Sequence, residues 1–141
     1  MAKLDGLIRV QKHAVDEKQK ILARLFREQE EHETAKRTIQ EQVDSETLVA
    51  NDMSNDPISR LSFGNFLAGA KQKISDIDAH LEKLEMRIEL AQENIRQAFE
   101  ELKKTEIIDK NRKEKIKKEK SKKENSELDD IGIEGHRRKQ D

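Results

Sequence analysis

The most constraining feature of this chain is a run of apolar residues that recur at alternating spacings of three and four between residues 67 and 102. Two interleaved series make up the run: Leu67, Ile74, Leu81, Ile88, Ile95 and Leu102, and Ala70, Ile77, Leu84, Ala91 and Ala98. This spacing places all of them along one stripe of an α-helix, as in the heptads of coiled coils. The stripe predicts a long helix that packs along its length against another helix, and it disfavours an enzyme built around a pocket.

Composition leads to the same fold class. Of the 141 residues, 33% are hydrophobic and 42% are charged, and the aromatic residues are four Phe. Such a chain cannot build a conventional globular core, and its seven-residue order favours long helices over disorder. The chain has no Cys and no apolar run of the roughly 18 residues that a membrane span requires. We therefore expect a soluble, cytoplasmic, all-α protein with no direct membrane insertion.

Two helices and one break are predicted. The first helix covers about residues 3–50, and its apolar stripe contains Leu4, Ile8, Val15, Leu22 and Leu25 and continues more weakly through Ala35, Ile39 and Val43. Turn-forming residues and the only Pro place a turn at 51–60, where Asp56 and Pro57 suit the start of a helix. The second helix covers about 61–108, and Gly64 and Gly69 weaken its first turns by about 1 kcal/mol each relative to Ala.

Two long helices joined by a short loop are expected to fold into an antiparallel coiled-coil hairpin. A loop centred near residue 55 places Leu25 near the region of Met86, Leu22 near that of Leu90, and Leu4 near that of Ile107 and Ile108. A two-helix hairpin is only marginally stable. The free protein is therefore expected to self-associate weakly, to fray at its ends, or to depend on a partner for its order.

The charges are strongly segregated although the net charge is −1. Residues 1–27 carry seven basic and three acidic groups, residues 28–56 two and nine, and residues 103–123 eleven and four. Residues 109–125 are expected to form a charged helical overhang. Apolar residues return in 126–141 at Leu128, Ile131 and Ile133, after a Ser126–Asp129 pair that resembles a capping box. With nothing in the hairpin left to pack on, this segment is predicted to be a short docking tail, and the sequence leaves open whether it is ordered or disordered in the free protein.

The sequence contains no catalytic constellation, no phosphate-binding loop and no metal-ligand spacing, so we expect no enzyme activity and no cofactor. Acidic residues interrupt the basic run and no aromatic residue accompanies it, which disfavours nucleic acid as a partner. His32 and His80 fall nearly opposite each other in the expected register. This leaves open a bound metal or a pH-sensitive contact, against the simpler alternative of exposed histidines beside a seam.

Three segments together resemble the flagellar export protein FliJ family: LDGLIRVQKHAVDEKQKILARL at residues 4–25, AFEELKKTEI at 98–107 and SELDDIGIEGHRRKQ at 126–140. The resemblance covers nearly the whole chain. It implies a stalk-like, non-enzymatic component of the flagellar type III export apparatus, peripheral to the inner membrane at the flagellar base. The implied partners are the flagellar export ATPase hexamer, the membrane protein of the export gate and the export chaperones.

On this resemblance we expect the two helix ends at the base of the hairpin to insert into the ATPase ring. The residues assigned to the ring-facing end and to the docking tail are Leu4, Leu7, Ile8, Lys12, Lys103, Lys104, Ile107, Ile108, Leu128, Ile131, Arg137 and Arg138. Three alternatives remain at this point: the equivalent stalk protein of a virulence secretion system, a structural coiled-coil adaptor or homodimer without an ATPase partner, and a rod that binds nucleic acid.

Overall fold

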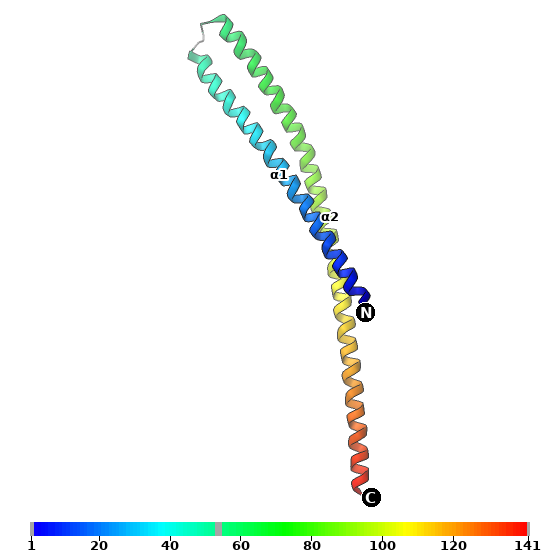
Figure 1. Cartoon of the computed structure of the whole chain (residues 1–141). Coiled ribbons are helices and arrows are strands. Elements are labelled where there is room, and N and C mark those ends of the chain that lie inside the picture. The colour runs from blue at the N-terminus through cyan, green and yellow to red at the C-terminus, as the bar shows by residue number, and fades with distance from the viewer. Residues whose placement is uncertain (1, 53–54, 141) are drawn as a thin grey trace. The chain divides into compact units, whose positions relative to one another are not determined.

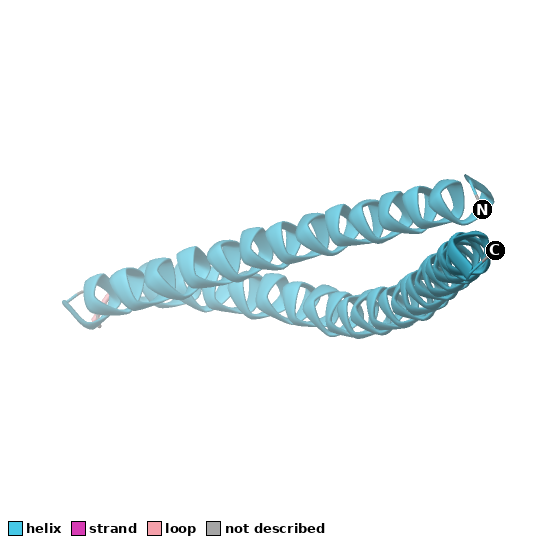
Figure 2. Ribbon diagram, turned by 90° about the horizontal axis from the view of Figure 1, so that it is seen from below, coloured by secondary structure: helices cyan, strands magenta, loops and turns pink. Residues whose placement is uncertain are grey.

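A computed structural model describes residues 2–52 and 55–140, with side chains over 4–52 and 55–138. Helix α1 spans Ala2–Asp52 and helix α2 spans Pro57–Gln140, with 51 and 84 residues (Figure 1). Helices and a short connection make up the ribbon in Figure 2. The all-α prediction is confirmed. Within the expected turn, Met53 and Ser54 lie outside the described residues, as does Asp141 at the end of the tail.

Asp56 fixes the start of α2. Its carboxylate accepts a hydrogen bond from the backbone amide of Ile58 at 3.0 Å and another from the hydroxyl of Ser59 at 3.0 Å. The amide of Arg60 donates to the Asp56 carbonyl at 3.1 Å, the first hydrogen bond of the helix. Pro57 occupies the first helical position, where a missing N–H costs nothing. The predicted role of Asp56 and Pro57 as a helix start is confirmed.

The chain divides into two compact units, each containing parts of both helices. We call Val15–Arg96 the hairpin unit, and Met1–Ala14 together with Gln97–Asp141 the terminal unit. In the hairpin unit the two helices run antiparallel and pack against each other on either side of the connection near residue 55 (Figures 1 and 2). This arrangement is the predicted helical hairpin.

The core of the hairpin unit is a cluster of four buried residues, Leu25, Leu84, Ile88 and Ala91, with Leu22 packed against it. The predicted seam supplies all three α2 members of this cluster. The observed register is close to the expected one, because Leu25 packs within one helical turn of Met86, the position predicted to lie opposite it. Met86 and Leu90, however, are 67% and 62% exposed, and they lie on the side of α2 that faces solvent. The two segments that we expected to meet do meet. The α2 residues that contact Leu25, however, are Leu84, Ile88 and Ala91 and not Met86 or Leu90.

Toward the connection, the packed stripe of α1 becomes polar. Gln29, His32 and Lys36 are half-buried and precede Ile39 and Val43 at the same alternating spacing. Ala35, which we expected on the apolar face, is exposed because the stripe passes through Lys36 instead. The Lys36 ammonium pairs across the two helices with the Asp78 carboxylate at 2.7 Å. This part of the hairpin unit is therefore held by fewer apolar contacts than the cluster around Leu25.

Gly64 and Gly69 lie inside α2, are exposed, and have open space where a β-carbon would stand. Neither has a positive φ that would favour glycine. Replacing both with Ala should therefore stabilise the hairpin unit by about 1 kcal/mol each, because Ala loses less backbone entropy in a helix. Urea unfolding followed by circular dichroism checks this. The reverse change at the exposed neighbour, Ala68→Gly, should destabilise by a similar amount, and a double variant no more stable than the parent would contradict the prediction.

Candidate docking surface

All twelve residues assigned to the ring-facing end and the tail lie in the terminal unit. Leu4 and Ile8 of α1 are half-buried and belong to the packed stripe of this unit. On α2 the buried positions are Leu102, Thr105 and Asp109, which continue the alternating spacing of three and four. Leu4 and Ile8 thus hold the unit together, and their apolar surface is only partly available to a partner.

An ion-pair network marks the place where α1 begins beside α2. The Lys113 ammonium lies 3.0 Å from the Asp109 carboxylate and 3.3 Å from the Asp5 carboxylate. These hydrogen bonds, first to Asp109 and then to Asp5, raise the pKa of Lys113 above its ordinary value. The pair between Asp5 and Lys113 connects residues far apart in the sequence and aligns the start of α1 with this turn of α2.

One polar atom inside this packing has no partner. The side-chain oxygen Oε1 of Gln11 is buried and accepts no hydrogen bond. Thr105 is buried too, but its hydroxyl donates to the Glu101 carbonyl at 3.0 Å, one turn earlier in its own helix. The seam of the terminal unit therefore contains polar positions that a purely apolar pattern does not reveal.

Around this packing lies a set of exposed residues that we call the base patch: Leu7, Lys12, Lys103, Lys104, Ile107 and Ile108. Leu7, Ile107 and Ile108 are 44%, 56% and 48% exposed, which is high for large apolar side chains. The four sequence-assigned residues of α2 in this patch fall within two turns. An apolar surface with basic neighbours is suited to bind a partner rather than to perform chemistry. Sequence reasoning missed Val10 and Phe99, which are exposed here as well, because both lie off the heptad stripe.

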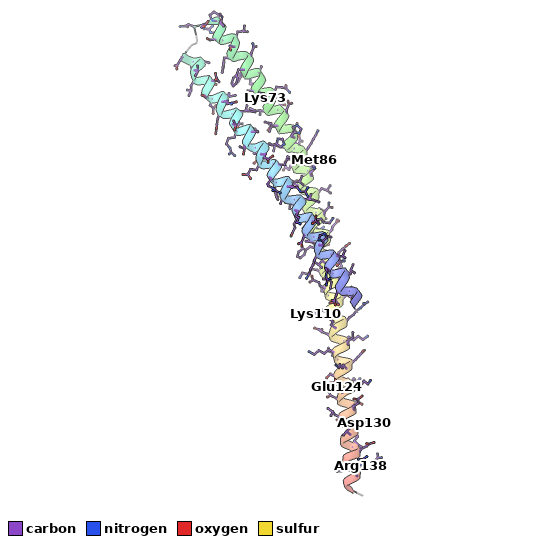
Figure 3. All side chains as sticks on the ribbon, viewed as in Figure 1. Lys73, Met86, Lys110, Glu124, Asp130 and Arg138 are labelled. Carbon is purple, nitrogen blue, oxygen red and sulfur yellow. The ribbon has the colours of Figure 1, made fainter. Side chains whose placement is uncertain are left out.

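Beyond this region α2 continues as a helix whose described side chains, from 110 to 138, are all exposed. Figure 3 shows the side chains of Lys110, Glu124, Asp130 and Arg138 projecting from a single ribbon. Leu128 and Ile131 are three residues apart and share one side of the helix with Arg138. The predicted docking tail is thus helical through Gln140, and its Leu128, Ile131, Arg137 and Arg138 are accessible to a partner.

A second exposed apolar surface lies at the connected end of the hairpin unit. We call it the turn patch: Leu48, Val49, Ile58, Leu61 and Phe66. A shallow groove there is lined by residues of both helices, including Val49, Ile58 and Phe63. Between residues 41 and 66 the chain has five acidic groups and one basic group, Arg60. Unlike the base patch, the turn patch is therefore apolar within an acidic surround, and no residue in it was singled out from the sequence.

Within the described residues, no three His, Cys, Asp or Glu side chains gather where they could hold a metal ion. No helix among those residues has a stretch long and apolar enough to cross a membrane.

Two long paired helices with exposed apolar patches define a helical-hairpin protein of the coiled-coil class. No curated protein and no solved structure matches the chain. A family model does match, the one described as flagellar FliJ protein, and it covers residues 1–141. The chain belongs to the FliJ family. It is thus a non-enzymatic component of the flagellar export apparatus and associates with the export machinery.

Proposed function

We propose that this protein is a stalk-like coupling component that docks with its terminal unit on the ring of the flagellar export ATPase. The observation that carries the proposal is the base patch, where Leu7, Ile107 and Ile108 are exposed beside basic side chains. Burial of these apolar groups would contribute most of the affinity, since each buried large side chain is worth about 1.5 to 3 kcal/mol. The basic residues would direct the encounter with an acidic socket.

The tail supports a second contact with the same partner. Leu128 and Ile131 are exposed on one side of α2. Gly132 and Gly135 lower the helix propensity of this segment, so that part of its order would come from binding. We assign Arg137 and Arg138 to the same contact, as cations near the end of the helix.

For the other implied partners, the export gate and the export chaperones, the turn patch is the surface that the chain offers. Its apolar residues are exposed within an acidic surround. A protein that bridges the ATPase and the gate needs separate surfaces for each, and the base patch and the turn patch belong to different units. The protein would then work on the cytoplasmic side of the inner membrane at the flagellar base.

Charge-introducing substitutions test the ATPase contact. Ile107→Asp together with Ile108→Asp should weaken capture of the purified export ATPase hexamer by the full chain at least tenfold, measured by titration in a pull-down or by surface plasmon resonance. Because both residues are exposed, the helices should remain folded by circular dichroism. The matched control is Met86→Asp with Leu90→Asp, which changes two somewhat more exposed apolar residues of α2 in the hairpin unit.

Truncation after Glu127 tests the tail in the same assay, and removal of residues 1–12 tests the start of α1. Full capture by both truncated chains and by the Ile107→Asp, Ile108→Asp variant would contradict docking through the terminal unit. Loss of capture in the Met86→Asp, Leu90→Asp control alone would move the docking surface to the hairpin unit.

A further inference from the structure

The outer face of α2 in the hairpin unit repeats the spacing of the packed stripe. Ala79, Lys83, Met86, Leu90 and Glu93 follow one another at alternating intervals of four and three residues. Each lies two residues after a member of the stripe that faces α1, and two residues correspond to about 200° around a helix. The five residues, which we call the outer seam, therefore lie on the side of α2 opposite to α1.

The middle of the outer seam is apolar and open to solvent. Met86 and Leu90 are 67% and 62% exposed, and they lie about one helical turn apart, so that their side chains are neighbours. Figure 3 labels Met86 on α2 of the hairpin unit. The spacing of the outer seam suits these side chains to interlock with a second helix laid along this face.

The charged residues that flank this apolar pair indicate which helix fits. Lys83 stands three residues before Met86, and Glu93 stands three residues after Leu90. When a second copy of α2 is laid antiparallel with Met86 opposite Leu90, the same register brings Lys83 opposite Glu93. The two-fold symmetry of such a pair forms each contact twice.

The parallel orientation lacks this match. In a parallel pair in register, each residue of the outer seam would meet its own counterpart, lysine against lysine and glutamate against glutamate. Like charges in contact oppose association, whereas opposite charges direct it. The charges therefore favour a second copy of this chain, in the antiparallel orientation, as the occupant of the outer seam.

The other charges around the outer seam nearly cancel. Residues 79–96 carry four acidic and three basic groups, so two copies meet with little net repulsion. At the edges of the antiparallel pair, Arg87 and Glu89 would each lie near their own counterparts, and Glu82 would lie near Arg96 of the second copy. All four side chains are exposed, and exposed charges contribute little to such a contact.

We propose that the outer seam of the hairpin unit is a self-association surface, through which two copies of this chain form a weak antiparallel dimer. A contact between single helices is smaller than the roughly 1,200 Å² of stable complexes, so we expect a dissociation constant of roughly 10 to 100 µM. At the lower concentrations used for capture and circular dichroism the chain is then monomeric. The proposal does not depend on the ATPase contact, because the outer seam shares no residue with the base patch or the turn patch.

Charge reversal tests the pairing of Lys83 with Glu93. The full chain is measured by sedimentation equilibrium between about 5 and 500 µM, at about 50 mM salt so that screening is limited. Lys83→Glu and Glu93→Lys should each weaken dimerisation at least tenfold, because like charges then meet. The double variant with both changes should recover to within about threefold of the parent. Glu93→Lys also removes an ion pair with Arg96 of the same helix, and the double variant keeps that loss, so its recovery reports the contact between copies.

Two matched controls change the same charges elsewhere on α2. Glu85→Lys and Lys73→Glu alter exposed residues of the hairpin unit that lie outside the outer seam, and both variants should dimerise as the parent does. Met86→Asp with Leu90→Asp should abolish dimerisation. Because both residues are exposed, the helix content of this variant by circular dichroism should equal that of the parent.

Cysteine pairing tests the orientation, and the chain contains no Cys of its own. A mixture of Lys83→Cys and Glu93→Cys chains should form disulfide-linked dimers on mild oxidation, since these positions lie opposite each other in the antiparallel register. Each variant alone should link much more slowly, because identical positions in that register are about 15 Å apart along the helix.

A chain that stays monomeric over the whole concentration range would overturn the proposal. Single charge variants that dimerise like the parent would overturn it too, as would faster linking of one cysteine variant with itself than with the other. If the chain is monomeric and the Met86→Asp, Leu90→Asp variant loses capture of the export ATPase, the outer seam binds that partner and not a second copy.

Discussion

Leu84→Ala should cost about 2 to 5 kcal/mol of unfolding free energy, the range for removing a large apolar side chain from a core. Leu84 is 3% exposed and lies in the middle of the cluster with Leu25, Ile88 and Ala91. A pair of helices cannot refill the space from a third layer, so the cavity stays. Because small domains are stable by only about 5 to 15 kcal/mol, this single change should unfold much of the hairpin unit at 37 °C.

Urea unfolding followed by circular dichroism measures the effect. The midpoints rather than the amplitudes are compared, since the exposed helix from residue 110 to 138 adds signal that does not depend on the buried cluster. Leu90→Ala is the matched control. It removes the same atoms from a residue that is 62% exposed on the same helix, and it should change stability by less than about 0.5 kcal/mol. Equal effects of the two substitutions would contradict the packing of α1 against α2 through Leu84.

Gln11→Leu should have the opposite sign and stabilise the terminal unit by about 1 to 3 kcal/mol. The buried Oε1 atom of Gln11 accepts no hydrogen bond, and an unsatisfied buried acceptor costs an amount in this range. Leu has nearly the same volume, lacks the polar atoms and suits a position in a helix seam. The gain is local, so amide exchange of residues 97–109 measures it better than global unfolding does.

Gln19→Leu serves as the control, because Gln19 is exposed on the same helix and its replacement should be nearly neutral. Gln11→Glu should destabilise strongly near pH 7, since it places a charge where a neutral oxygen is already unsatisfied. If Gln11→Leu left protection unchanged or lowered it, the side-chain oxygen would have to be hydrated in solution. A more stable Gln11→Leu variant would show that Gln11 lowers the stability of the terminal unit. Polar residues at seam positions commonly have this cost in coiled coils, where they select one register.

Much of this fold follows from local periodicity. The eight large residues of the predicted α2 seam, from Leu67 to Leu102, all lie in the buried or half-buried stripe. The stripe is predictable because a helix repeats every 3.6 residues whatever packs on it. The signals for the start of α2 are local as well, since the Asp56 side chain and the proline ring act within one turn. The helix was nevertheless predicted from about residue 61, after a turn at 51–60, and it begins at Pro57.

The candidate docking residues were harder to predict. The sequence placed Leu4, Leu7 and Ile8 together at the start of α1, but only the packing separates exposed Leu7 from half-buried Leu4 and Ile8. The prediction for Ala35 was wrong for a related reason. Ala35 is apolar and was expected on the packed face, but the neighbouring Lys36 occupies that position, and its long side chain reaches Asp78. The turn patch escaped notice because its residues follow no single period.

The sequence alone determined that this chain forms two long helices, that a break near residues 51–60 separates them, and which stripe of the second is apolar, because all three depend on interactions within a few turns. The register depends on contacts between distant segments, and only the tertiary structure decided it. Packing placed Leu84 rather than Met86 against Leu25, left Gln11 buried without a partner, brought Asp5 to Lys113 and stacked His32 on His80. The tertiary structure also determined which apolar side chains form the exposed patches for which we propose partners. A side chain of an amphipathic helix is exposed or buried according to where the second helix packs.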